Sequence, residues 1–128
     1  MASILKEVTG PGEVILSPFG WVSDVVPFLV HGFKPVFVDV DMHNMSSSTD
    51  AIIDAITEDT KAVLMVHILG FNGLTEKLMN TLDEKGIMLI EDCCESHGAT
   101  FNGRKIGTFG AMSNFSFYFG HHMTTIEG

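Results

Sequence analysis

Ionisable side chains follow several of the short apolar runs in this sequence. They are Asp39 and Asp41, His67, Asp92 with Glu95 and His97, and His121 with His122. In an open α/β sheet, ligands bind outside the carboxyl ends of the strands. If the apolar runs are parallel strands, these groups converge on one edge of the sheet. Carboxylates and imidazoles placed there can take up and release protons near neutral pH.

Each of these groups also has a purely structural interpretation. An Asp at the end of a strand is often a turn or helix cap. The single His67 in an apolar run is typical of a hydrogen-bonded core residue, and His121-His122 fits a solvated turn. Spacing alone leaves these alternatives open.

The elements that must position these groups alternate along the chain. Strands are expected over residues 14–17, 35–41, 61–69, 87–92 and 115–119. One helix is expected to be capped by Ser23 or Asp24, to run towards His31 with Pro27 in its first turn, and to end at Gly32. Further helices are expected from caps at 47–49 through Ile56 and over 74–85. Asn102-Gly103 is a hairpin-type turn. The pattern predicts an α/β fold, with a parallel-rich, doubly wound sheet and helices on both faces.

Composition narrows the class of protein. The 128 residues are 45% apolar and 18% charged, which is typical of one globular domain or part of a larger one. A net charge of −9 without a Lys/Arg cluster argues against nucleic acid or an anionic membrane as partner. No apolar run reaches membrane-spanning length, and we expect no signal peptide. Adjacent Cys93 and Cys94 are expected to be reduced thiols, so we expect a cytoplasmic protein.

Taken in order, a set of short motifs resembles the DegT/DnrJ/EryC1/StrS sugar aminotransferase family of pyridoxal phosphate (PLP) enzymes, which has the aspartate aminotransferase fold. The motifs are Gly12–Ile15, Phe19-Gly-Trp-Val22, Pro35–Asp39, Val66-His67, Ile90–Ala99, Gly103-Arg104 with Gly107, Phe115-Ser-Phe117 and Glu127-Gly128. The resemblance implies that residues 1–128 are a fragment of the large, PLP-binding domain. The phosphate-binding turn upstream and the small C-terminal domain would lie outside this stretch.

The resemblance also implies roles for individual residues. Asp92 corresponds to the acid that pairs with the pyridine nitrogen of the cofactor, and Trp21 to the aromatic residue over its ring. Glu95 stands where the family usually has Gln and would face the ring's 3-hydroxyl. Ser116 corresponds to the hydroxyl that holds the phosphate, and His97 has a supporting role. Core packing of Trp21 and a capping role for Asp92 are the alternatives.

One departure from the family pattern decides the predicted reaction. Family members carry a Schiff-base Lys five residues after that Ser, and here the position is His121. An imidazole cannot form a stable imine but can still transfer a proton. PLP or pyridoxamine phosphate (PMP) would therefore be bound noncovalently, with His121 as general base. His122 is expected to be structural.

This departure resembles the sugar-nucleotide 3-dehydratase branch of the family, which acts in colitose and 3,6-dideoxyhexose biosynthesis. The implied substrate is a nucleotide-linked 4-keto-6-deoxyhexose for surface polysaccharide (O-antigen), with an amino donor such as glutamate. A homodimer is also implied, with its sites built across the subunits.

Four alternatives stay open at this point. The chain could be a PLP-dependent sugar-nucleotide aminotransferase, although no Lys occupies the required position. A nicotinamide dinucleotide enzyme could use Asp39, but Gly10-Pro-Gly12 precedes its strand and has no third glycine at the required spacing. A metal hydrolase would need an unusual ligand set from His67, Asp92, His97, His121 or His122. An inactive fragment would keep only the fold.

Overall fold

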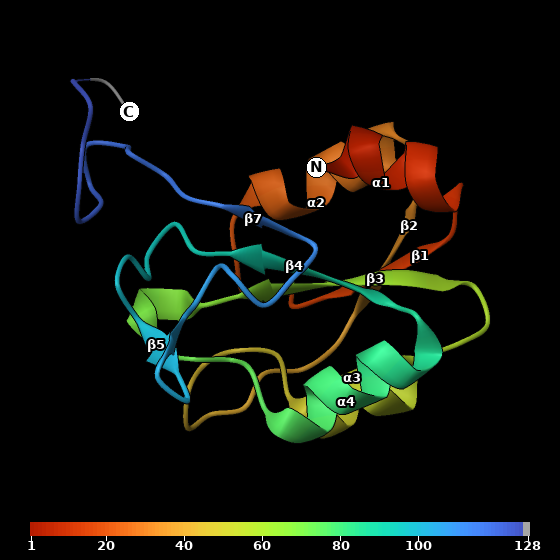
Figure 1. Ribbon diagram of the computed structural model, residues 1–128. Helices are drawn as coiled ribbons and strands as arrows, with labels where there is room; N and C mark the ends of the chain where they lie inside the picture. Colours follow the sequence, from red (N-terminus) through yellow and green to blue (C-terminus); the bar gives the residue numbers. More distant parts are fainter. Residues whose placement is uncertain (127–128) are drawn as a thin grey trace.

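A five-stranded parallel sheet forms the middle layer of the structure (Figure 1). The computed structural model describes residues 1–126, so Glu127 and Gly128 of the last motif lie outside the described residues. In order across the sheet, the strands are β2 (Lys34–Phe37), β1 (Glu13–Leu16), β3 (Thr60–Val66), β4 (Met88–Asp92) and β7 (Met112–Asn114). The predicted parallel-rich sheet is confirmed.

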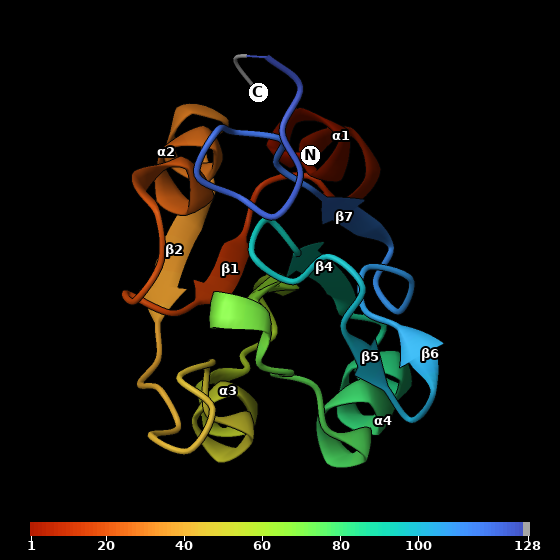
Figure 2. The same cartoon turned by 90° about the vertical axis from the view of Figure 1, so that its left-hand side faces the viewer.

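Helices cover both faces of this sheet, as predicted (Figures 1 and 2). Helices α1 (Ala2–Thr9) and α2 (Val22–Val30) lie on one face, and α3 (Thr49–Ala55) and α4 (Glu76–Lys85) lie on the other. Successive strand residues point to opposite faces. On β3, Leu64 packs into the core beneath α1 and α2, whereas Val63 and Met65 pack into the core beneath α3 and α4. On β4, Ile90 and Leu89 divide in the same way.

Helix α2 begins earlier than predicted. Its N-cap is Trp21, and the carboxylate of Asp24 accepts a hydrogen bond of 2.9 Å from the Trp21 N–H. Asp24 is therefore the third helical residue and caps from inside the helix. The prediction that Pro27 lies in the first turn was wrong. Pro27 lies in the second turn, where it leaves the Ser23 carbonyl without its helical donor.

Helices α3 and α4 begin and end close to the predicted residues. The Ser48 hydroxyl caps α3 and the Thr75 hydroxyl caps α4, while Gly86 ends α4 in the left-handed conformation at φ 66°. Residues 68–70 form a 3-10 turn rather than the last part of a strand. Helix α1 was not predicted, because Met1 offers no side-chain cap to mark its start.

Two strand predictions need correction. Residues 115–119 are not a strand, because β7 pairs with β4 only as far as Asp92↔Asn114 and β4 ends there. The strand predicted over 35–41 is shorter than expected and is not buried. It lies at the edge of the described sheet, where it pairs only with β1 and leaves Phe37 53% exposed.

The Asn102-Gly103 turn is confirmed. It joins β5 (Thr100–Phe101) and β6 (Arg104–Lys105) in an antiparallel hairpin. Both turn residues have positive φ, 50° and 77°, as a two-residue hairpin loop of this kind requires.

None of the helices described within residues 1–126 combines the length and apolar character needed to cross a lipid bilayer.

The core beneath α1 and α2 packs against the strands whose carboxyl ends form one edge of the sheet. We expect Leu64→Ala to lower the free energy of unfolding by about 2–5 kcal/mol, because it leaves a cavity in a fully packed layer. Urea denaturation measures this change. Leu29→Ala, on the exposed side of α2, is the matched control and should cost less than about 1 kcal/mol. Equal losses in the two variants would contradict this description of the core.

Candidate active site

The carboxyl ends of the central strands open into a pocket of about 710 Å³. Its walls come from the segments that follow β1, β3, β4 and β7, and from the start of α2. The five residues predicted to be catalytic or cofactor-binding all line it: Trp21, Asp92, Glu95, Ser116 and His121. The structure therefore brings together side chains that are up to 100 positions apart in the sequence.

Asp92 is the last residue of β4 and points to the face that α1 and α2 cover, as Ile90 does. Its side chain is almost fully buried, and its Oδ1 accepts a hydrogen bond of 2.9 Å from the Cys94 N–H. Burial opposes ionisation. However, hydrogen bonds from Asp24, Cys94 and Asn114 outweigh it and lower the pKa of the Asp92 carboxyl below its ordinary value. The pocket therefore contains a buried carboxylate that is ionised at neutral pH.

A second carboxyl, Asp24, lies beside Asp92 and was not predicted to belong to the site. It comes from the first turn of α2 and is only 8% exposed. Burial, together with the hydrogen bond and negative charge of Asp92, raises the pKa of Asp24 to about 7. The sequence suggested only a capping role for Asp24. Its place in the first turn of a helix that follows a strand end was the signal that could have identified it.

Two aromatic residues that follow β1 give the pocket an apolar wall. Trp21 is 75% exposed and Phe19 is 50% exposed, and both line the pocket. The alternative in which Trp21 packs into the core is therefore wrong for the described chain. The indole offers a broad flat surface for a planar ligand.

Glu95 connects the turns that follow β3 and β4. Its Oε2 accepts a hydrogen bond of 2.9 Å from the N–H of Leu69, a residue held in the left-handed region at φ 51°. Glu95 also borders a smaller hollow of about 290 Å³, together with His121 and His122. One oxygen of this carboxylate thus stabilises the wall of the pocket.

The segment that follows β7 closes another side of the pocket. The Ser116 hydroxyl accepts a hydrogen bond of 3.2 Å from the Tyr118 N–H and lies half-buried in the wall. Asn114 donates from Nδ2 to the Cys94 sulfur at 3.0 Å. The Oδ1 of Asn114 is buried without a partner among the described residues.

The three histidines of the predicted site take different positions. His121 is half-buried, lines the main pocket, and donates its backbone N–H to the Tyr118 carbonyl at 2.9 Å. His122 borders only the smaller hollow, with its ring 6.0 Å from that of His97. His97 packs against Phe115 and Phe117 and does not line the main pocket. Within residues 1–126, no lysine or arginine lines the pocket.

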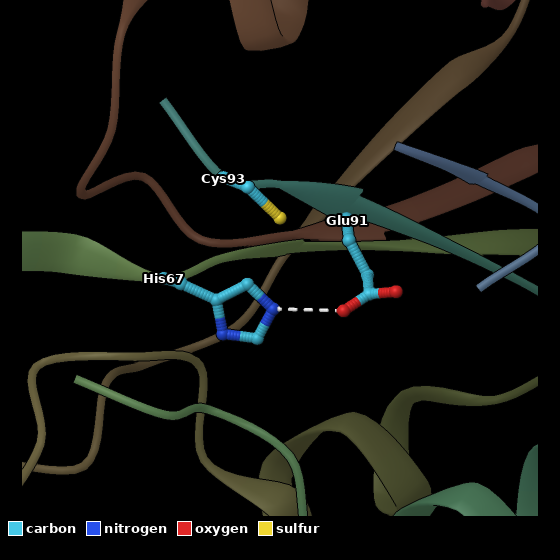
Figure 3. Close-up of side chains that lie close together, drawn as sticks. All are labelled: His67, Glu91 and Cys93. Carbon is cyan, nitrogen blue, oxygen red and sulfur yellow. Dashed lines mark ion pairs between the residues drawn. The ribbon is translucent and has the colours of Figure 1, made fainter. Parts of the chain in front are cut away.

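A buried polar cluster lies on the opposite face of β4 (Figure 3). Glu91 is fully buried, and its carboxylate accepts hydrogen bonds from the N–H groups of Gly107, Phe109 and Gly110 at 2.6–2.9 Å. His67 Nε2 lies 3.3 Å from Glu91 Oε2, and its Nδ1 accepts a hydrogen bond from the Gly73 N–H. His67 is thus a hydrogen-bonded core residue. Sequence reasoning missed Glu91, because its donors come from a distant loop.

Cys93 also belongs to this cluster. His67, Glu91 and Cys93 each have an atom that could bind a metal ion, and these three atoms lie within 4.8 Å of one another. Burial, together with the charge of Glu91, raises the pKa of the Cys93 thiol to about 12, so the sulfur stays protonated. We therefore assign the cluster a structural role. Of the histidines and Asp92 considered as hydrolase ligands, only His67 belongs to a group this compact within the described residues.

Asp39 and Asp41 do not line the pocket. Each accepts a hydrogen bond of 2.8 Å from a backbone N–H in the loop that follows β2, Asp39 from Val40 and Asp41 from His43. Their turn-capping interpretation is the one that the structure supports.

Comparison with known proteins agrees with this geometry. Residues 2–128 match the profile of the DegT/DnrJ/EryC1/StrS aminotransferase family. The chain belongs to this family. The resemblance and the fold class predicted from the sequence are both confirmed, and the family is PLP-dependent.

Relatives with two kinds of activity are similar to this chain. GDP-4-keto-6-deoxy-D-mannose 3-dehydratase of Escherichia coli O55:H7 is 36% identical over 116 residues, which is 91% of this chain and 30% of that protein. GDP-perosamine synthase of Vibrio cholerae is 38% identical over 121 residues, which is 94% of this chain and 33% of that protein. The chain therefore spans about a third of the length of these curated relatives.

A solved structure repeats the fold. The E. coli GDP-4-keto-6-deoxy-D-mannose 3-dehydratase with bound hydrated PLP superposes with a TM-score of 0.92 at 32% identity. The superposition covers 99% of this chain and 34% of that one.

The buried Glu91 carboxylate should make the stability of the fold depend on pH. Burial opposes its ionisation, but His67 and the three N–H donors lower the pKa of the Glu91 carboxyl below 4.5. Its stabilisation is therefore present above pH 4.5 and lost as pH falls through the lowered pKa. We expect Glu91→Gln to lower the free energy of unfolding at pH 7 by about 3 kcal/mol, measured by urea denaturation. The variant should also lose less stability on acidification.

The exposed Glu84→Gln on α4 is the control and should change stability by less than about 0.5 kcal/mol. A Glu91→Gln variant as stable as this control would show that the hydrogen bonds to the loop at 107–110 do not stabilise the fold.

Proposed function

We propose that this chain is the cofactor-binding part of a PLP- or PMP-dependent 3-dehydratase that acts on a nucleotide-linked 4-keto-6-deoxyhexose. One observation carries the proposal: His121 lines the same pocket as Asp92, and no lysine lines that pocket within residues 1–126. Identity alone does not separate the two activities, because 3-dehydratases and aminotransferases match the chain at 36% and 38%. The imidazole is what favours dehydration.

The residues present fit a vitamin B6 cofactor. The ionised Asp92 has no cationic partner within the described pocket, which suits a protonated ring nitrogen. The exposed indole of Trp21 would lie against the ring, and the Ser116 hydroxyl would hold the phosphate. Glu95 would face the ring hydroxyl.

When bound, such a cofactor supplies a pyridine ring that accepts electrons from the reacting carbon. Asp92 would hold the proton on the ring nitrogen. His121 Nδ1 or Nε2 would remove a proton as general base and return it as an acid when the C3 hydroxyl leaves. Because His121 carries no primary amine, the cofactor would be held noncovalently.

The wider setting is also part of the proposal. We propose that residues 1–128 belong to the large domain of a longer homodimeric enzyme, whose phosphate-binding turn and small domain lie outside this stretch. Relatives include the lipopolysaccharide biosynthesis protein RfbH of Salmonella typhimurium, which supports a role in surface polysaccharide synthesis. A similar GDP-4-keto-6-deoxymannose-3-dehydratase structure contains a trapped PLP-glutamate geminal diamine, which supports glutamate as amino donor. The free thiols of Cys93 and Cys94 suit the cytoplasm.

The test is product identification. The full-length protein is incubated with PMP and GDP-4-keto-6-deoxymannose, and the sugar product is analysed by mass spectrometry. We expect loss of the C3 oxygen. Gain of nitrogen would support the aminotransferase alternative, and an unchanged sugar would support an inactive protein.

Two neighbouring histidines provide a matched pair of variants for this assay. His121→Ala should slow dehydration by about 10²–10⁴-fold, because a positioned general base is lost. His122→Ala should stay within about threefold of the unmodified protein, since His122 borders only the smaller hollow. Equal effects of the two substitutions would contradict the role given to His121.

A further inference from the structure

Two buried carboxyl groups from different elements line the pocket. Asp24 comes from α2 and Asp92 from the end of β4, and they are 8% and 7% exposed. The two carboxyl groups lie close enough for each to shift the pKa of the other. A hydrogen bond between them requires a proton, because two carboxylates have only acceptor oxygens.

The remaining contacts of the pair decide which carboxyl carries the proton. Asp92 Oδ1 also accepts a hydrogen bond of 2.9 Å from the Cys94 N–H, and the Cys94 thiol and Asn114 further lower the pKa of Asp92. Asp24 accepts a hydrogen bond of 2.9 Å from the Trp21 N–H, and no second donor to it is found within residues 1–126. More donors therefore stabilise the anion on Asp92, and the proton belongs to Asp24.

No fixed positive charge can replace this proton. The other titratable side chains of the pocket are His67 at the end of β3, Cys94 and Glu95 after β4, and Tyr118 and His121 after β7. Burial and the Asp92 carboxylate raise the pKa of Cys94 to about 12, so its thiol is neutral. Within residues 1–126, neither lysine nor arginine lines the pocket. The pair thus depends on the shared proton to stay together.

We propose that Asp24 is a positioning residue that carries the single proton of the Asp24–Asp92 pair and, by donating it, keeps Asp92 ionised and oriented toward a cationic ligand. The proposal rests on the proposed function in one respect, which is that this ligand is the protonated ring nitrogen of a B6 cofactor. Beyond that function, it assigns to Asp24 the role of keeping Asp92 ionised.

The pair makes the charge of the pocket floor depend on pH. Below about pH 7 the pair holds one proton and one negative charge. Above this value both carboxyls are ionised, and Asp24 no longer donates to Asp92. Asparagine at position 24 preserves the donor at every pH, because its amide N–H can replace the acid O–H. Alanine removes the donor.

The first experiment measures the pair without any cofactor. Carboxyl ¹³C chemical shifts of Asp residues are recorded against pH in the full-length protein. We expect one carboxyl to titrate near pH 7 in the unmodified protein and this titration to be absent in Asp24→Asn. The exposed Asp83→Asn on α4 is the control and should leave it in place. If every Asp carboxyl titrates below pH 5, the shared proton does not exist and the proposal is overturned.

The second experiment measures PMP binding to the full-length protein at pH 6 by equilibrium dialysis. We expect Asp24→Ala to weaken binding by about tenfold or more, since Asp92 loses a charge-assisted hydrogen bond. Asp24→Asn should stay within about threefold. Unchanged affinity in a folded Asp24→Ala variant would overturn the proposal. If that variant does not fold, the titration of the unmodified protein and of Asp24→Asn decides.

The two readouts separate this inference from the proposed function. A carboxyl that titrates near pH 7 in a protein that does not bind PMP would refute the B6 function, while the Asp24–Asp92 pair would stand. PMP binding without that titration would refute the pair and leave the B6 function intact.

Discussion

The constraint on which the site depends is a buried carboxylate, Asp92, that has no lysine or arginine beside it in the pocket formed by residues 1–126. Removing a carboxylate from water costs several kcal/mol unless other groups replace the water. At Asp92 these groups are hydrogen-bond donors: the Cys94 backbone and thiol, Asn114, and the acid form of Asp24. They come from the turn after β4, from β7 and from α2, so the ionised state of one side chain depends on three segments being in place.

Because side chains alternate along β4, Asp92 and the structural carboxylate Glu91 lie on opposite faces of the sheet. Asp92 points to the face of α1 and α2, where Asp24 lies, whereas Glu91 points to the other face and pairs with His67 (Figure 3). Glu91 also fixes the loop at 107–110 through three backbone donors, and this loop leads directly into β7. One carboxylate therefore holds the scaffold, and its neighbour faces the ligand.

Local signals in the sequence predicted most strands of the sheet and the approximate ends of helices α3 and α4. Apolar runs marked the strands, Ser48 and Gly86 marked helix ends, and Asn102-Gly103 marked the hairpin. The strand predicted over 115–119 failed because an apolar run does not show where its partner strand ends. Hydrogen bonding in three dimensions decided that boundary.

The predicted site residues all line one pocket, because strand ends meet at one edge of a parallel sheet. Asp24 and Glu91 could not be predicted from spacing in the same way. Asp24 lies in the first turn of α2, whose N-cap is Trp21 and not Ser23 or Asp24, and Glu91 is satisfied by N–H groups 16–19 residues further along the chain. A first-turn position after a strand was the local signal for Asp24, whereas Glu91 depends on contacts that no local pattern records.

The central claim is that an imidazole occupies the place of the cofactor-binding lysine, and borohydride reduction tests it most directly. The full-length protein and His121→Lys are each incubated with PLP, reduced and analysed by peptide mass spectrometry. The account predicts no stoichiometric adduct in the unmodified protein and an adduct at position 121 in the variant. A stoichiometric adduct on any lysine of the unmodified protein would contradict it.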